Sequence, residues 1–375
     1  MNGAFVLCKR DLRKFTRQPI MMVAAVIAPF IMLVLLGYAF GGTISHTQLA
    51  IVRESYGRAS SDLLGVLKNE QSCSYGGINC ANAFQLLNVP DLNAAQQMLR
   101  NGKINAILLI PSGFDQAAPS NRHISVYLDN TDPLSAGTIS TQMSNVGQQL
   151  VQVQIDSPPE STNSIELIGF YRNVQYTEFM APGSIIQAIM TASIIGGGIS
   201  ILNDKQNGII EGYLVTPLKQ YEIVVGFLLA GVIKAMFSAV AMLVLAVLFA
   251  GVHPYVGVSG FAMIMLTLFL TALGIISMTT AYAVRMPNRD VYQFTIFPLN
   301  MILYFTSGAV YPTQGFPTWM RQISMINPEA YAVHAIRMLM YKGATLSAVL
   351  GDLSFLALFT TIMLGMATLA FKRRL

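Results

Sequence analysis

Charged side chains are scarce in this chain of 375 residues. Only 11% of the residues are Asp, Glu, Lys or Arg, and 53% are hydrophobic, whereas soluble domains carry about a quarter charged residues. This scarcity of charge excludes an ordinary soluble domain and predicts a protein that is embedded in a lipid bilayer.

The residue constellations of common enzymes are also missing. The four histidines (His46, His123, His253 and His334) show no paired metal-ligand spacing, and neither G-x-S-x-G nor H-E-x-x-H occurs. Without G-x-x-x-x-G-K-S/T, we expect no ATP hydrolysis by a P-loop in this chain. We therefore predict that the chain is not an enzyme and holds no metal or cofactor. Active transport would need an ion gradient or a partner subunit.

Only three cysteines occur. Cys8 lies on the predicted cytoplasmic side, whereas Cys73 and Cys80 bracket the stretch CSYGGINC in a predicted outer domain, where oxidation is possible. We predict a Cys73–Cys80 disulfide, with two unpaired thiols as the alternative. No metal site is expected there, because no His or further Cys lies near.

Six long apolar runs are present. An apolar helix needs about 20 residues to cross roughly 30 Å of hydrocarbon, and only helices or closed barrels satisfy their own backbone in lipid. The sequence therefore predicts an all-α polytopic membrane protein with six spans, the first within 19–42 and five within 179–375, at about 179–202, 223–250, 259–284, 291–310 and 349–371. The first run is too long for a cleaved signal peptide and contains Pro29, so we interpret it as a retained span.

Basic residues predict the orientation. Five Lys or Arg residues lie within 9–17, three lie within 372–374, and Arg285 and Arg289 lie between spans four and five. Because Lys and Arg mark cytoplasmic flanks, we expect both termini of this multi-pass protein on the cytoplasmic side of the cell (inner or plasma) membrane. The net charge of +5 thus reflects topology, and no nucleic-acid partner is expected.

The first 18 residues predict an amphipathic helix. Phe5, Cys8, Leu12 and Phe15 share one helical face, and basic residues surround the other. Such a helix lies in the membrane interface, with its apolar face among the headgroups and its basic residues on anionic lipids. The alternative is a plain positive anchor in front of the first span.

Residues 43–178 are mostly polar and predict an extracytoplasmic domain of mixed α/β structure. We expect strands at 48–53, 83–89, 104–110 and 123–128, helices at 62–68, 91–102 and 133–155, and a loop at 157–163. Asp91 is the expected N-cap of the second helix, which ends at Gly102. A segment of this size can bury a core of its own.

Residues 311–348, between spans five and six, predict two short helices. The first covers 317–326, and the second begins at Asn327, an N-cap followed by Pro328, and ends at Gly343. Because both are short and only moderately apolar, we interpret them as a re-entrant hairpin that dips into the outer leaflet.

Lys234 is essentially the only ionisable residue deep inside a predicted span. One interpretation is a functional charge at mid-bilayer. Alternatively, Lys234 snorkels to the cytoplasmic headgroups, which we prefer, or neutralises a partner within the bundle. Since no acidic residue lies in the central part of any span, a proton relay is not expected.

The polar segment 203–222 separates spans two and three and is too long for a simple turn. Ile209, Ile210, Tyr213 and Leu214 recur in it at helical spacing. The pair Thr216-Pro217 then ends the pattern. A short amphipathic helix of this kind docks into a groove on a soluble partner. The alternative is a loop that rests on the membrane.

The stretch GIIEGYLVTPLKQYEIVVG within this region resembles the cytoplasmic coupling region of type-2 ABC exporter permeases. The matching positions are Glu211, Leu214, Thr216, Pro217, Glu222 and Gly226, whereas Gly208 matches more loosely. A second stretch, SGAVYPTQGFPTWMRQISMINPEAYAVHAIR, resembles the outer hairpin of that family, with Pro317, Trp319, Asn327, Pro328 and Arg337. Glu329 and His334 depart from the commoner pattern, which bears on the substrate. The start KRDLRKFTRQP…APF also fits, whereas the outer domain matches only in position and size.

The resemblance implies a dimer of permeases, identical or related, each seated on an ABC ATPase from another chain that binds ATP and Mg. The residues that would couple to this ATPase are Gly208, Glu211, Gly212, Tyr213, Leu214, Thr216 and Pro217. ATPase closure would push the coupling helix and the N-terminal helix. Three glycines at 196–198 offer a small-residue surface, either at the dimer seam or for packing within the chain.

We interpret the chain as the permease subunit of an ATP-driven exporter. Spans that carry almost no charge favour an amphipathic or lipid-like cargo, a drug or a lipid, that leaves the cytoplasm or the inner leaflet. The alternatives are ATP-driven sodium efflux, which the scarcity of acids in the spans disfavours, and a membrane-anchored ligand-binding receptor. The outer domain would either handle cargo or contact a periplasmic or envelope partner.

Overall fold

The computed structural model describes residues 3–17, 26, 29–30, 47–69, 71–73, 80–82, 84–117, 122–152, 164–209, 212, 220–249, 251–252 and 257–372. The chain forms two compact units. The sheet unit comprises residues 40–179 and 311–317, and the helical unit comprises residues 1–39, 180–310 and 318–375. Each unit has a hydrophobic core of its own.

The sheet unit is built on a five-stranded sheet in the order β4-β1-β5-β6-β7. Its strands are β1 (Thr47–Arg53), β4 (Phe84–Val89), β5 (Ala106–Ile110), β6 (His123–Leu128) and β7 (Ser164–Gly169). β1 is parallel to β4 and β5, β6 is antiparallel to β5, and β7 is parallel to β6. Parallel neighbours require crossover connections, which contain α3 (Arg58–Asn69), α4 (Leu92–Arg100) and α5 (Pro133–Gln152).

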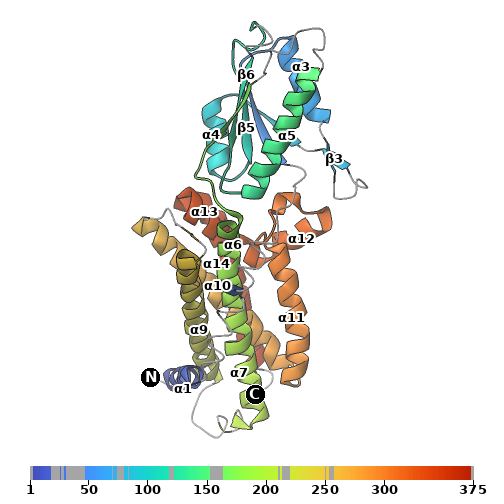
Figure 1. Ribbon diagram of the computed structural model, residues 1–375. Coiled ribbons are helices and arrows are strands. Elements are labelled where there is room, and N and C mark those ends of the chain that lie inside the picture. The colour runs from blue at the N-terminus through green and yellow to red at the C-terminus, as the bar shows by residue number, and fades with distance from the viewer. Residues whose placement is uncertain are drawn as a thin grey trace. The chain divides into compact units, whose positions relative to one another are not determined.

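Helices cover both faces of this sheet (Figure 1). Because successive strand residues point to opposite faces, Leu49 and Ile51 of β1 pack into a core with α3 and α5, whereas Ala50 and Val52 pack into a second core with α4. The continuous apolar run of β5 is buried between them, as expected for a central strand.

The sequence predicted most of this unit. All four expected strands and all three expected helices are present, and the carboxylate of Asp91 caps α4 by accepting a hydrogen bond from the backbone N–H of Ala94 at 2.6 Å. Two features were not predicted: β7, and an antiparallel pair formed by β2 (Gln71–Cys73) and β3 (Cys80–Asn82). The loop expected at 157–163 lies outside the described residues.

The helical unit contains long helices that run close to the predicted spans. They are α6 (Tyr176–Ser193), which continues through the wide π-helical segment η2 (Ile194–Ile199) into α7 (Ser200–Gln206), and α9 (Gln220–Phe249), α10 (Val258–Arg285), α11 (Arg289–Thr306) and α14 (Leu346–Lys372). Among the described residues, four helices are long and apolar enough to cross a membrane: 176–206, 222–249, 258–285 and 346–370. α11 is shorter and contains Pro298, and the predicted first span lies almost wholly outside the described residues. A polytopic helical membrane protein is therefore supported, and the count of six spans stays a prediction.

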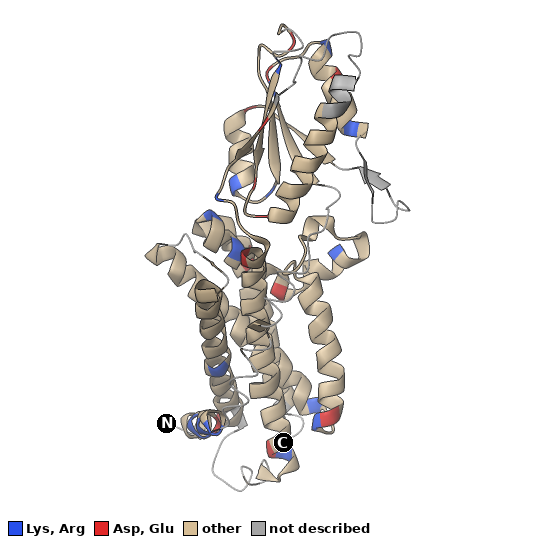
Figure 2. Cartoon of the chain, viewed as in Figure 1, with Lys and Arg blue, Asp and Glu red and all other residues tan. Residues whose placement is uncertain are grey.

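The long helices expose apolar side chains. Charged residues are sparse along α9, α10 and α14 (Figure 2). On α9 the exposed large side chains recur every three or four residues and include Val225, Leu229, Ile233, Phe237, Val240 and Val244. An uncovered apolar stripe of this length is typical of a helix that faces lipid hydrocarbon.

Two short helices, α12 (Thr318–Ile326) and α13 (Pro328–Lys342), form the hairpin predicted before the last span. The side-chain oxygen of Asn327 caps α13 by accepting a hydrogen bond from the N–H of Glu329 at 2.9 Å, and Gly343 ends it with φ 57°. The amide of Asn327 also donates to the carbonyl oxygen of Leu303 at 2.6 Å, near the end of α11. The helices and the cap are confirmed, whereas entry into the outer leaflet is not tested.

The pairing of β2 with β3 places Cys73 directly opposite Cys80, where Cβ atoms approach to about 4.5–5.5 Å. We therefore expect both thiols to resist alkylation in the denatured, unreduced protein and to react only after reduction, as measured by peptide mass mapping. Cys8 is the matched control and should react without reduction. Alkylation of Cys73 and Cys80 before reduction would show that the disulfide is absent.

Candidate functional site

Helix α1 (Gly3–Thr16) packs against α9. Its buried face consists of Leu7, Cys8, Asp11 and Phe15. The helix itself is confirmed. Of the predicted apolar face, Cys8 and Phe15 are buried, Leu12 is half-buried and Phe5 is 68% exposed, and the contact of this face with the membrane interface stays a prediction. The buried face turns Asp11 toward a lysine of α9.

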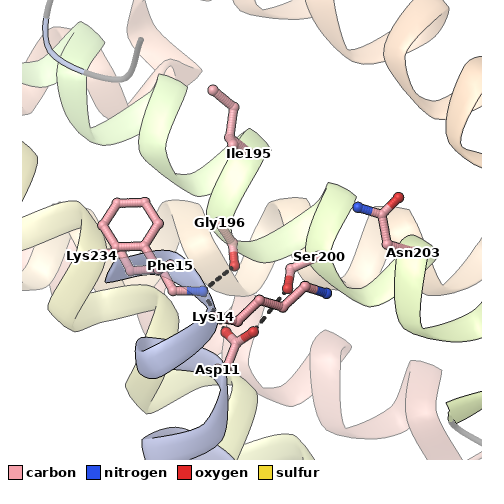
Figure 3. A pocket seen from close by; sticks show the side chains of 8 residues that line it. All are labelled: Asp11, Lys14, Phe15, Ile195, Gly196, Ser200, Asn203 and Lys234. Atoms are coloured by element: carbon pink, nitrogen blue, oxygen red, sulfur yellow. Dashed lines mark hydrogen bonds and ion pairs between the residues drawn. The ribbon is translucent and has the colours of Figure 1, made fainter. Parts of the chain in front are cut away.

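This lysine is Lys234, which is 2% exposed and forms an ion pair with the carboxylate of Asp11. Its ammonium group also donates to the carbonyl oxygen of Gly196 at 3.0 Å, and the hydroxyl of Ser200 donates to Asp11 at 2.9 Å. Figure 3 shows these groups meeting from α1, α9 and the η2–α7 segment. Lys234 therefore neutralises a partner within the bundle. The preferred snorkelling interpretation is wrong, because α1 supplies a carboxylate that the spans lack.

A second carboxylate, that of Asp204 in α7, is completely buried and binds the basic face of α1. Asp204 is ion-paired with Arg10 and, at 3.1 Å, with Lys14. The two carboxylates thus tie α1 to α9 and to α7. α7 leads directly into the segment predicted to dock on a partner.

The three glycines at 196–198 allow this close packing. A Cβ added at Gly196 would lie 2.8 Å from the side chain of Lys234, and one at Gly197 would lie 2.3 Å from that of Ile276. At Gly198 it would lie 2.0 Å from the hydroxyl oxygen of Tyr292. These neighbours belong to α9, α10 and α11 of the same chain. The glycines therefore pack within the chain, which was one of the two alternatives for this stretch.

Sequence reasoning missed Asp11, Ser200 and Asp204 as site residues. A signal was available, since residues 1–18 hold one acid among five basic residues. A lysine inside a bundle needs a carboxylate or a set of acceptors. Asp11 was thus a ready candidate for the partner of Lys234.

Of the predicted coupling residues, the structure describes Gly208 and Gly212. Gly208 follows α7 with φ 68°, and its N–H donates to the carbonyl oxygen of Lys205 at 3.2 Å. A Cβ at Gly212 would meet no atom within 4 Å. The other predicted coupling residues lie outside the described part of the chain: Glu211, Tyr213, Leu214, Thr216 and Pro217.

The predicted outer-hairpin residues have different surroundings. Arg337 donates to the carbonyl oxygen of Gly308 at 3.0 Å, and Pro328 is buried in the first turn of α13. Trp319 is exposed, and Pro317 belongs to the sheet unit. Asn327 and Arg337 therefore hold α13 to the segment that ends α11.

The helices and the buried charge cluster define a polytopic membrane protein whose N-terminal helix is tied to its transmembrane bundle. The sequence profile of the family described as ABC-2 family transporter protein matches residues 19–369. The chain belongs to this family and is a transport permease, a type of subunit that works with an ABC ATPase.

The curated relatives are distant, and two of them span nearly the whole chain. Probable multidrug ABC transporter permease YbhR of Escherichia coli (strain K12) is 21% identical over 99% of this chain and 98% of its own length. Probable multidrug ABC transporter permease YbhS of the same strain is 20% identical over 98% of this chain and 96% of its own length. Putative transport permease ycf38 of Cyanophora paradoxa is 28% identical over 49% of this chain and 63% of its own length. No solved structure matches this chain.

Replacing Lys234 by Met leaves the carboxylate of Asp11 buried without its cation. We expect K234M to lower the free energy of unfolding by about 3–5 kcal/mol, as measured by SDS titration of the purified chain in mixed micelles. The double change Asp11→Leu with Lys234→Met should recover most of this loss, because no isolated charge remains.

The matched control is Lys9→Met, at an exposed position of α1, which should change the free energy of unfolding by no more than about 0.5 kcal/mol. If K234M unfolds like this control, the ion pair does not hold α1 to α9.

Proposed function

We propose that this chain is the membrane subunit of an ATP-driven exporter that moves an amphipathic or lipid-like cargo out of the cytoplasm or the inner leaflet. Two copies, or one copy and a related permease, would each bind an ABC ATPase, which holds ATP and Mg. The observation that carries the proposal is the joining of α1, α7 and α9, by one buried ion pair and two half-buried ones, in a chain of the ABC-2 family.

The ion pairs would pass a movement of the ATPase on the cytoplasmic side to the helices of the bundle. An ATPase that docks on residues 203–222 would push the end of α7. Asp204 transmits this push to α1 through Arg10 and Lys14, and Asp11 passes it to α9 through Lys234. Because separating a buried ion pair leaves two uncompensated charges, the three helices would move together.

The lining of the bundle supports the class of cargo. The described long helices carry few charged groups, and Lys234 is already occupied by Asp11. A strongly polar cargo would have to leave water without new partners, which is costly. A molecule with a large apolar part enters at lower cost, as the names of the E. coli relatives suggest for drugs.

Replacing Glu211 and Tyr213 together by Ala tests the docking. We expect the affinity-purified variant to lose its stoichiometric ATPase, and its ATP-driven transport in proteoliposomes to fall to background. Tyr56→Ala is the matched control, since Tyr56 is 77% exposed in the sheet unit, and this variant should retain the ATPase. A complex that survives the double change would count against docking at 203–222.

A further inference from the structure

Glu329, in the first turn of α13, is a buried acid without a partner. It is 1% exposed, and neither of its carboxyl oxygens has a hydrogen-bond partner among the described residues. An isolated buried carboxylate is so unfavourable that the group takes up a proton instead. Accordingly, burial raises the pKa of Glu329 to about 8. The resting protein therefore holds a neutral carboxylic acid here at pH 7.

Glu329 lies beside the outer end of α11. Asn327, two residues earlier, donates to the carbonyl oxygen of Leu303 and, at 3.0 Å, to the hydroxyl of Thr306. Asn300 lies about one turn before Leu303 on the same helix. Its side-chain oxygen is buried and also has no hydrogen-bond partner in the described structure.

Gln187 of α6 also has a buried side-chain oxygen without a hydrogen-bond partner among the described residues. A Cβ at Gly183, about one turn away on α6, would lie 2.2 Å from Ala309, just beyond the end of α11. The helical unit thus holds buried acceptors besides Glu329 that lack donors.

The surrounding charged groups are engaged elsewhere. Arg337 of α13 donates to Gly308, and His334 of α13 is paired with Asp352 of α14 at 2.7 Å. Because neither carboxyl oxygen of Glu329 has a hydrogen-bond partner, Arg321 of α12 and Tyr304 of α11 do not bond to it. α10 carries no Asp, Glu, Lys or Arg from 258 to 284. No described cation therefore neutralises Glu329.

A buried carboxyl without donors calls for a ligand that carries N–H donors and positive charge. We propose that Glu329 binds the cationic N–H-bearing group of an amphipathic cargo. This proposal rests on the proposed function and specifies its cargo. On binding, the carboxylic acid of Glu329 releases its proton to water, and the resulting carboxylate pairs with the cation of the cargo.

The test compares two dyes on the full chain in complex with its ATPase in proteoliposomes. Rhodamine 6G is a permanent cation with N–H donors, and Nile red is an uncharged amphipathic dye. The readout is the dye concentration that half-maximally stimulates ATP hydrolysis. In the unaltered complex, the value for rhodamine 6G should rise about tenfold per pH unit below pH 8, because protons compete for Glu329. The value for Nile red should not change with pH.

Glu329→Gln keeps the size of the side chain and removes the charge. We expect E329Q to raise the half-maximal concentration of rhodamine 6G at least about tenfold at pH 8 and to abolish its pH dependence, with Nile red unchanged. Glu166→Gln, at an exposed position of β7, is the matched control and should behave like the unaltered complex.

Two results would overturn the cation site while leaving the exporter in place: an unchanged response of E329Q to rhodamine 6G, or an equal loss for both dyes, which indicates a structural role. If neither dye stimulates the unaltered complex, the amphipathic cargo itself is refuted, and the assignment of this ligand with it.

Discussion

The bundle depends on the ion pair between Asp11 and Lys234, in which both side chains are 2% exposed. Moving either charge alone out of water costs several kcal/mol. The pair therefore fixes the rotation of α1, since Asp11 must face α9. It leaves Phe5 and Val6 exposed, and they are apolar side chains that a membrane surface would cover.

A second consequence concerns the basic face of α1. With Asp11 held by α9, Arg10 and Lys14 lie against Asp204 and are only partly available to lipid headgroups. The positive N-terminus, from which a cytoplasmic orientation is predicted, is thus also a structural element. The glycines at 196–198 complete the arrangement, because a Cβ at any of them would overlap the side chain of Lys234, Ile276 or Tyr292. A π-helical segment at such a crossing is consistent with a functional role, since wide turns frequently occur at functional sites.

Local signals explain what the sequence predicted. Asp91 and Asn327-Pro328 mark the starts of helices, because a cap bonds to residues within three positions of it. The apolar runs of α9 and α10 are recognised by their length alone. The partner of Lys234, Asp11, lies 223 residues away in the sequence. A local pattern of apolar and polar residues cannot predict a contact between residues so far apart. The burial of Asp11 was missed for the same reason, because counting apolar positions along α1 cannot place a buried carboxylate. β7 was missed because its short sequence, SIELIG, directly follows a polar stretch that is typical of a loop.

Lys234 and Glu329 show two different solutions for a buried charge in one bundle. Lys234 has an ion pair and a carbonyl oxygen, so its environment is complete, as expected of a group that holds helices together. Glu329 has a well-formed backbone cap at Asn327 but no partner for its carboxyl oxygens. Packing alone would favour an apolar residue at that position, because an unsatisfied polar group destabilises the fold. The presence of an acid where an apolar side chain would be more stable is consistent with a partner that arrives from outside the chain.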